Sequence, residues 1–359
     1  MLTSASNDMP AEPVATSEPI MTVAPPHDVT RTKTLRVSVP IRSQCDLVTE
    51  DDGLISQFLG YNSNCVDFID DPEHADLVVL FEQFSFKQRS HIQTLLKSPL
   101  VRQCAHKLFV INYDDTGQGF LPGCYTSLRR STFDARIHKS CAYPKNYNQF
   151  VGVPNDSAAT HLYSFRGSLD SHPVRSKLFN TLRYDPEGLL NPVCQSLNTH
   201  TESQKRLFVE EVAKSSFVLC PRGQGPSSYR LFEVMALGRC PVIISDDWIP
   251  IGGVDWKTVS VRISESIVHE IPNVLKRLRC NATEMGVRAR QVWEAHFSPP
   301  AKFRSFLEDI VALSWENRDG QLTSFRSLES RLRSCEFSWR CGWTLPQRVG
   351  RLVRRVTKW

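Results

Sequence analysis

Short apolar runs, rich in β-branched residues, recur along this chain and alternate with segments whose apolar residues have helical spacing. Such runs are typical of parallel strands that are buried on both faces of a sheet. In the first half of the chain they are Thr34–Val39, Ala75–Phe81 and Lys107–Ile111, and Ser90–Leu100 has helical spacing between the last two. Alternating strands and helices predict a wound α/β domain.

A second series of the same kind begins with a strand at His161–Phe165. Proline suits the first position of a helix and glycine the position just after one, which sets several of the boundaries that we expect. The next elements are expected to be a helix, a strand, a helix that ends at Gly238, and a strand: Pro173–Leu182, Ser216–Cys220, Ser227–Leu237 and Pro241–Ile244. Later helices are expected over Ile267–Leu278, over Met285–His296 and after Pro300.

These two series predict a chain of two domains with flanking segments. We expect residues 34–155 and 156–315 to form two Rossmann-like domains. Residues 1–33 are rich in Pro, Ala, Ser and Thr, a composition that predicts disorder. Residues 316–359 form a basic C-terminal tail.

Composition limits the classes of protein to which the chain can belong. A hydrophobic fraction of 41% and a charged fraction of 23% are typical of a globular protein. No apolar run approaches the roughly 18 residues that cross a bilayer, and residues 1–30 have no signal-peptide pattern, so we expect a cytoplasmic protein. The 11 cysteines include no Cys-x-x-Cys pair, which favours reduced thiols over disulfides or zinc.

The positive charge is concentrated at the C-terminus. Residues 326–359 carry nine Lys or Arg and two Glu, a net of +7, while the whole chain carries +5. Because the excess lies in a tail rather than on a folded domain, we expect no nucleic-acid partner. Residues 347–359 are basic and amphipathic, a pattern that favours peripheral contact with an anionic membrane; the alternative is a helix packed on the first domain.

The stretch from Cys220 to Gly238 reads as strand, glycine loop and helix. Ligands of open α/β sheets bind at the carboxyl ends of the strands, where this loop must lie. Gly223 and Gly225 remove Cβ atoms, so that the backbone can approach a bulky anion. The sequence therefore predicts a diphosphate site in this loop.

Side chains that suit a diphosphate flank the two glycines. Ser227 and Ser228 lie where the helix should begin, and free N–H groups there favour phosphate. Arg222 and Arg230 are suited to charge-assisted contacts with phosphate oxygens.

Glu233 lies in the second turn of the helix that follows the loop. A carboxylate repels phosphate, so its expected partner is a pair of neutral donors such as the vicinal hydroxyls of ribose. The alternatives are a solvated glutamate and an ion pair with Arg230 three residues earlier.

The whole stretch resembles the exostosin family, glycosyltransferase family 47. The resemblance rests on Cys220–Gly223, Arg230–Glu233 and Pro241–Ile244, with Ser245–Ile251 after them and Phe165–Ser168 before them. Arg175 follows Phe165–Ser168. The resemblance is strong over about 160–300 and faint over 34–155.

The resemblance implies a GT-B fold, in which two Rossmann-like domains face a central cleft, a nucleotide-sugar donor (commonly a UDP-sugar) and an inverting reaction. It also implies that Glu233 binds ribose. Arg166, Arg222, Ser227, Ser228 and Arg230 would then surround the diphosphate.

Metal-dependent sugar transferases hold a cation with an Asp-x-Asp motif, and this sequence has none. We therefore expect no metal and no other cofactor, with the leaving group stabilised by arginines and a helix N-terminus. The base that deprotonates the acceptor is expected from the first domain. Asp114 and Asp115 follow one of its strands and Glu82 follows another, although capping or solvated carboxylates explain them equally well.

The last site residues lie after the strand that ends at Ile244. Asp246 and Asp247 are candidates to contact donor-sugar hydroxyls, and an Asx turn is the alternative. Trp248 is suited to line the donor pocket or to pack in the core. His161 and His172 are given no catalytic role.

We thus expect an inverting, metal-independent glycosyltransferase that acts on a polysaccharide or a lipid-linked glycan acceptor. The alternatives are a retaining GT-B transferase, since the sequence also carries a Glu-x-Met-Ala-x-Gly-x-x-Pro pattern from Glu233 to Pro241, and a catalytically silent subunit that binds nucleotide or a partner enzyme.

Overall fold

The structure is a computed structural model of the chain. It describes residues 34–41, 52–62, 64, 66–83, 89–115, 119–152, 158–193, 200–317 and 324–333. The predicted disordered segment 1–33 and all of the basic tail beyond Arg333 lie outside the described residues. Within the described ranges, no helix has both the length and the apolar character needed to cross a bilayer.

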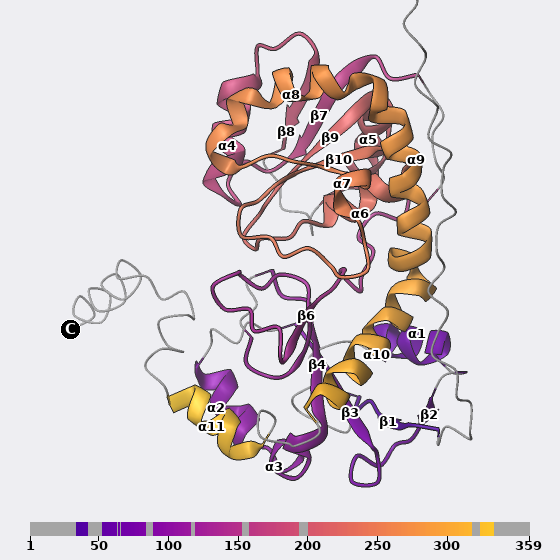
Figure 1. Ribbon diagram of the computed structural model, residues 1–359, viewed down its shortest axis with the longest axis vertical. Coiled ribbons are helices and arrows are strands. Elements are labelled where there is room, and N and C mark those ends of the chain that lie inside the picture. Colours follow the sequence, from indigo (N-terminus) through magenta and orange to yellow (C-terminus); the bar gives the residue numbers. More distant parts are fainter. Residues whose placement is uncertain are drawn as a thin grey trace, which may run out of the picture. The chain divides into compact units, whose positions relative to one another are not determined.

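The first domain contains a sheet of six parallel strands in the order β2-β1-β3-β4-β5-β6 (Figure 1). The strands are β1 (Arg36–Ser38), β2 (Asp67–Phe68), β3 (Leu77–Glu82), β4 (Leu108–Asn112), β5 (Gly123–Tyr125) and β6 (His138–Ser140). Its helices are α1 (Asp52–Asn62), α2 (Arg89–Lys97), α3 (Pro99–Cys104) and the 3₁₀ turn η1 (Ala105–Lys107). Every residue of β3 and β4 is buried, as their unbroken apolar sequences predict.

The second domain contains a sheet of five parallel strands in the order β11-β10-β9-β7-β8. The strands are β7 (His161–Gly167), β8 (Gly188–Pro192), β9 (Ser215–Pro221), β10 (Cys240–Ile244) and β11 (Val261–Arg262). Its helices and turns are α4 (Pro173–Leu182), α5 (Glu202–Ala213), α6 (Tyr229–Ala236), α7 (Trp256–Val259), η3 (Glu265–Glu270), α8 (Ile271–Leu278), η4 (Arg279–Asn281), α9 (Ala282–Val292) and η5 (Trp293–Phe297). The predicted α/β class with two parallel-sheet domains is confirmed.

Local sequence signals explain most of these boundaries. Pro173 occupies the first turn of α4, where its missing N–H costs nothing, and Gly238 has a φ of 70° just after α6. The helix predicted over Ser90–Leu100 is instead two helices, because Pro99 begins α3. The helix predicted over Ile267–Leu278 is a 3₁₀ turn with non-helical backbone at Ile267, followed by α8.

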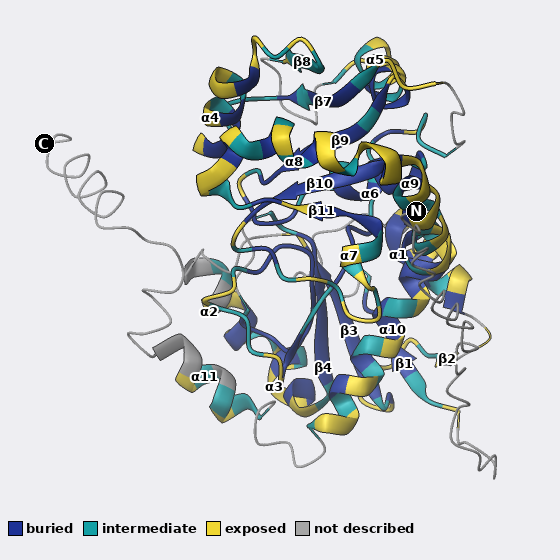
Figure 2. Ribbon diagram, turned by 45° about the horizontal axis from the view of Figure 1, so that its top comes forward, coloured by how far each residue is buried: buried dark blue, intermediate teal, exposed yellow. Residues whose placement is uncertain are grey.

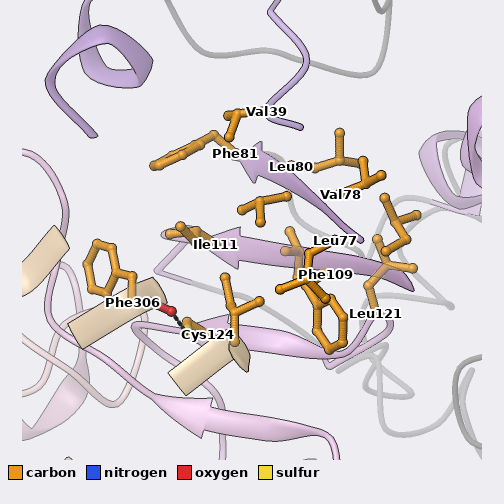
Figure 3. Close-up of a cluster of buried hydrophobic side chains, with 14 of the residues drawn as sticks. Val39, Leu77, Val78, Leu80, Phe81, Phe109, Ile111, Leu121, Cys124 and Phe306 are labelled. Atoms are coloured by element: carbon orange, nitrogen blue, oxygen red, sulfur yellow. Dashed lines mark hydrogen bonds between the residues drawn. The ribbon is translucent and has the colours of Figure 1, made fainter. Parts of the chain in front are cut away.

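Helix α10 (Pro299–Glu316) differs from the predicted domain boundary, which assigned residues 156–315 to the second domain. Phe303, Phe306 and Ile310 of α10 are buried in the core of the first sheet. The backbone carbonyl of Phe306 accepts a weak hydrogen bond of 3.7 Å from Sγ of Cys124 in β5 (Figure 3). The chain thus returns to its first domain, which the final described helix α11 (Phe325–Arg333) also contacts through α2.

The central strands of the two sheets, such as β3, β4, β9 and β10, are buried, whereas helices such as α8 and α9 expose one face (Figure 2). Loops at the carboxyl ends of the two sheets are in direct contact. Ser127, two residues after β5, accepts a hydrogen bond of 3.2 Å from the backbone N–H of Ser227, which follows β9. Likewise, Arg130 donates to the backbone carbonyl of Trp248 after β10. Any group held at one sheet edge therefore faces residues of the other domain.

Candidate functional site

The predicted diphosphate loop runs from Arg222 to Ser228, between β9 and α6, at the carboxyl edge of the second sheet. Gly225 is the point of closest approach to the first domain. A Cβ atom on Gly225 would overlap the backbone carbonyl of Asp115 and the hydroxyl of Ser127. The structure therefore brings together the loop and one of the carboxylates that the sequence predicts as a base.

Several buried donors around this loop have no hydrogen-bond partner among the described residues. They are Oγ of Ser171, Nε of Arg222, Nε and Nη1 of Arg230, and Oγ of Ser245. An unpaired buried donor costs about 1–3 kcal/mol, so a folded protein seldom keeps several together. They share one sheet edge and three of the five belong to guanidinium groups, so the ligand that would satisfy them is an anion.

Arg222 combines a buried side chain with carboxylate neighbours. Its Nη1 lies 3.1 Å from Oδ2 of Asp247 and 3.6 Å from Oε1 of Glu265. Asp247 thus neutralises Arg222 in this structure, and its predicted contact with donor-sugar hydroxyls stays a prediction. Asp246 instead accepts hydrogen bonds from Ser264 and from the backbone N–H of Glu265. These partners lie in another loop, so the bonds are not those of an Asx turn, and the contact of Asp246 with donor-sugar hydroxyls stays a prediction.

The side chain of Arg166 binds a carboxylate, whereas the sequence predicted that it binds the diphosphate. Its Nη1 lies 2.6 Å from Oε1 of Glu211 on α5, in an ion pair that is mostly buried, and Asn191 donates to the same oxygen. Burial raises the pKa of Glu211, while Asn191 and Arg166 oppose the rise. The guanidinium of Arg166 is therefore held by a carboxylate, and only its backbone carbonyl takes part in the loop, as an acceptor for Arg230.

Glu233 lies on α6 and lines a pocket that is partly open to solvent. Aromatic side chains dominate the lining: Tyr143, Tyr147, Tyr229, Phe232, Trp293 and Phe297. Within the described part of the chain, the carboxylate of Glu233 has no hydrogen bond and no ion pair, so the alternative of a pair with Arg230 is not formed. Burial raises the pKa of Glu233 to about 7, against the opposing effect of Arg230.

The three candidate bases of the first domain occupy different environments. Asp115 lies against the loop and accepts a hydrogen bond of 2.5 Å from the hydroxyl of Tyr143. Burial raises the pKa of Asp115, and the bond from Tyr143 opposes that rise. The backbone N–H of Asp114 donates a hydrogen bond of 3.3 Å to Oδ1 of Asn112. Glu82 is buried and lies 3.0 Å from Nε2 of His91. Of the three, only Asp115 is shown next to the loop, through its backbone carbonyl at Gly225, while its carboxylate binds Tyr143.

A cluster of tyrosines beside the loop was not found from the sequence. The rings of Tyr143 and Tyr229 stack with centroids 3.5 Å apart, and the hydroxyls of Tyr147 and Tyr229 lie 3.1 Å apart. Tyr143 and Tyr147 lie in an irregular segment without periodicity, so no sequence signal marked them. Arg175 entered only through the family resemblance and received no role.

Trp248 and His172 make structural contacts. Trp248 is buried and its ring packs edge-on against Trp256 at 4.8 Å, which matches the core alternative. His172 caps α4 by accepting a hydrogen bond from the backbone N–H of Val174. In the described ranges, no group of three or more His, Cys, Asp or Glu side chains is placed to hold a metal ion. The absence of a metal requirement stays a prediction.

Part of the chain that forms this site also matches a known protein family. Residues 120–278 match the model of the Exostosin GT47 domain. Over this stretch the chain is similar to the exostosin GT47 domain. The match contains β7, the Arg222–Ser228 loop, Glu233 and β10, so the resemblance predicted from the sequence is confirmed.

Curated relatives of the exostosin domain are similar over limited stretches. An exostosin-1 homolog of Caenorhabditis elegans is 36% identical over 92 residues, which are 25% of this chain and 24% of the relative. A probable glucuronosyltransferase of Oryza sativa subsp. japonica is 33% identical over 135 residues, or 36% of this chain and 31% of the relative. This chain thus spans a quarter to a third of the length of these relatives.

Among solved structures, the crystal structure of TarM overlaps with 66% of this chain and 54% of its own at 10% identity, with a TM-score of 0.41. The assignment of the exostosin domain rests on the family match and on the curated relatives.

Proposed function

We propose that the exostosin domain transfers a sugar from a nucleotide-sugar, with a UDP-sugar as the expected donor, to a polysaccharide or lipid-linked glycan. The observation that carries the proposal is the group of unpaired buried donors around the Arg222–Ser228 loop. A diphosphate supplies acceptor oxygens and negative charge to these donors at once. Other anions do so too, but the neighbouring pocket favours a nucleoside diphosphate.

The pocket at Glu233 suits the nucleoside part of the donor. Its aromatic walls offer surfaces on which a base or sugar ring can pack, and the carboxylate is an acceptor without a partner in the described structure. A ribose diol would donate two hydrogen bonds to that carboxylate without bringing positive charge. Glu233 and the loop are joined by α6, so one helix would hold both parts of the donor.

The reaction needs stabilisation of the departing diphosphate and a base for the acceptor hydroxyl. Arg222 and Arg230 would stabilise the growing negative charge as fixed cations in a dry site, without a metal ion. Asp115 is the proposed base, because it lies against the loop and its pKa is raised towards the value at which a base works well near neutral pH. Since the base and the leaving group lie in different domains, an inverting displacement is proposed.

The test is turnover of UDP-, GDP- and dTDP-sugars with glycan acceptors, measured as release of the nucleoside diphosphate. We expect release from one donor class, a product of inverted anomeric configuration by NMR, and activity that survives excess EDTA. Binding of nucleotide without release from any donor would mean a silent subunit. A product of retained configuration would refute the inverting step, and loss of activity in EDTA with rescue by Mn²⁺ would refute the metal-free step.

A further inference from the structure

Arg175 is a buried arginine beside the proposed donor site, and the reaction outlined above gives it no part. We infer that Arg175 is a positioning residue that joins the loops after β7 and β9 and, with Arg230, holds buried positive charge for a diphosphate to neutralise. This inference rests on the proposed function and assigns a residue that sets the shape and charge of the same site.

The guanidinium of Arg175 reaches from α4 to three backbone carbonyls at the carboxyl edge of the second sheet. Nε donates to the carbonyl of Arg222 at 2.8 Å, Nη1 to that of Ser168 at 3.1 Å, and Nη2 to that of Pro221 at 3.2 Å. Ser168 follows β7, while Pro221 and Arg222 lead into the diphosphate loop. One planar group therefore contacts both loops at three points, which the single nitrogen of a lysine can match only in part.

The second guanidinium, that of Arg230, lies close to the first. A Cβ atom on Gly167 would overlap Nη2 of Arg230 and would lie 3.5 Å from Nη1 of Arg175, so the two groups converge on this glycine. Both also lie over the ring of Phe165, with centroid distances of 6.0 Å for Arg175 and 5.0 Å for Arg230. Glycine at position 167 is required by this close approach, because any side chain would displace Arg230.

Neither guanidinium has a carboxylate within ion-pair distance in the described structure. Asp115 acts on Arg175 and Glu233 acts on Arg230 only at longer range. Burial lowers the pKa of Arg175 and the positive charge of Arg230 lowers it further, yet guanidinium groups stay protonated in proteins. Two buried cations without a paired anion destabilise the ligand-free protein, and a bound anion removes that cost.

The geometry thus separates two tasks. Arg230 has two nitrogen atoms without a partner and can bond to a phosphate, whereas each of the three nitrogen atoms of Arg175 already donates to a backbone carbonyl, which fixes its guanidinium on the loops. Arg175 would act on the ligand through its charge and through the loop that it holds, and not by direct contact.

The experiment titrates UDP and inorganic pyrophosphate into the full chain by calorimetry, for the wild type, Arg175→Met and Arg239→Met. Arg239 is the matched control: it also donates to a backbone carbonyl, that of Ala213, but it lies before β10 at the opposite edge of the same sheet. We expect Arg175→Met to weaken binding of both ligands about tenfold or more and Arg239→Met to leave both affinities unchanged.

Each other outcome is decisive. Equal affinities of Arg175→Met and the wild type would overturn the inference and leave the proposed function standing. Weaker binding by Arg239→Met to the same extent would also overturn it, because the loss would then follow any lost arginine. Failure of the wild type to bind UDP and pyrophosphate would overturn the proposed function and this inference together.

If Arg175→Met does not fold, Arg175→Lys takes its place, since it keeps the charge but can bridge the loops less completely. We then expect UDP to bind about threefold or more weakly than to the wild type, since part of the hydrogen bonding is lost. Wild-type affinity in Arg175→Lys would show that the clamp has no effect on the ligand and would overturn the inference.

Discussion

We expect ionisation of Glu233 to destabilise the ligand-free protein. Burial raises the pKa of its carboxyl group from 4.5 to about 7. A carboxyl group whose pKa is higher in the folded state than in the unfolded state destabilises the folded protein when it ionises. The free energy of unfolding therefore falls as pH rises from about 4.5 to 7, and it stays at the lower value above pH 7. At about 1.36 kcal/mol per pKa unit the loss is at most ~3 kcal/mol, and we expect ~1–2 kcal/mol because the pocket admits some water.

Glu233→Gln keeps the size of the side chain and removes its charge. At pH 8 the ligand-free variant should be more stable than the wild type by ~1–2 kcal/mol. Near pH 4.5 the difference should be small, because Glu233 is protonated in the folded state and about half protonated in the unfolded state. Urea denaturation of both proteins at pH 4.5, 6 and 8, followed by circular dichroism, measures this difference directly. Both proteins share every other titratable group, so the difference between their free energies of unfolding at each pH isolates the titration of Glu233.

The matched control is Glu284→Gln, which removes a glutamate that is exposed on α9 and paired with Arg288. It should change the free energy of unfolding by less than about 0.5 kcal/mol at every pH. The reasoning is refuted if Glu233→Gln is no more stable than the wild type at pH 8, or if its advantage is the same at pH 4.5.

Three further substitutions test separate parts of the site. Gly225→Ala should lower the free energy of unfolding by ~1–3 kcal/mol in urea, because its Cβ meets Asp115 and Ser127, whereas Gly252→Ala, with open space around it, should not; equal effects would contradict the close approach. Asp115→Asn should lower kcat by ~100-fold or more at unchanged affinity for UDP, while Glu82→Gln should not; the reverse order would assign the base to Glu82. Arg166→Met should destabilise the fold by ~3 kcal/mol by leaving Glu211 unpaired, without changing the affinity for UDP; weaker UDP binding would restore Arg166 as a phosphate contact.

The parts of the fold that were predicted correctly depend on local signals. The bounds of α4 follow from Pro173 and from the apolar spacing after it, and the end of α6 follows from Gly238. The strands β3, β4, β9 and β10 follow from unbroken apolar runs. Strands β5 and β6 have only three residues each, too few to show a period.

The parts that were not predicted depend on contacts between residues far apart in the sequence. Nothing local to Arg166 indicates that Glu211 lies beside it, since β7 and α5 meet only in the folded sheet. The return of α10 to the first core is likewise decided by buried residues such as Phe303 and Ile310, whose pattern would suit either domain. Arg175 shows the same limit, because its three carbonyl partners come from two separate loops.

The central claim is that one nucleoside diphosphate binds along the Arg222–Ser228 loop and Glu233. Calorimetric titration of UDP, GDP and dTDP into the wild type and into Glu233→Ala tests it most directly. We predict that one of the three binds the wild type, and that its affinity falls about tenfold or more in Glu233→Ala while the fold is retained. Binding of none of them, or equal binding by both proteins, would contradict the account.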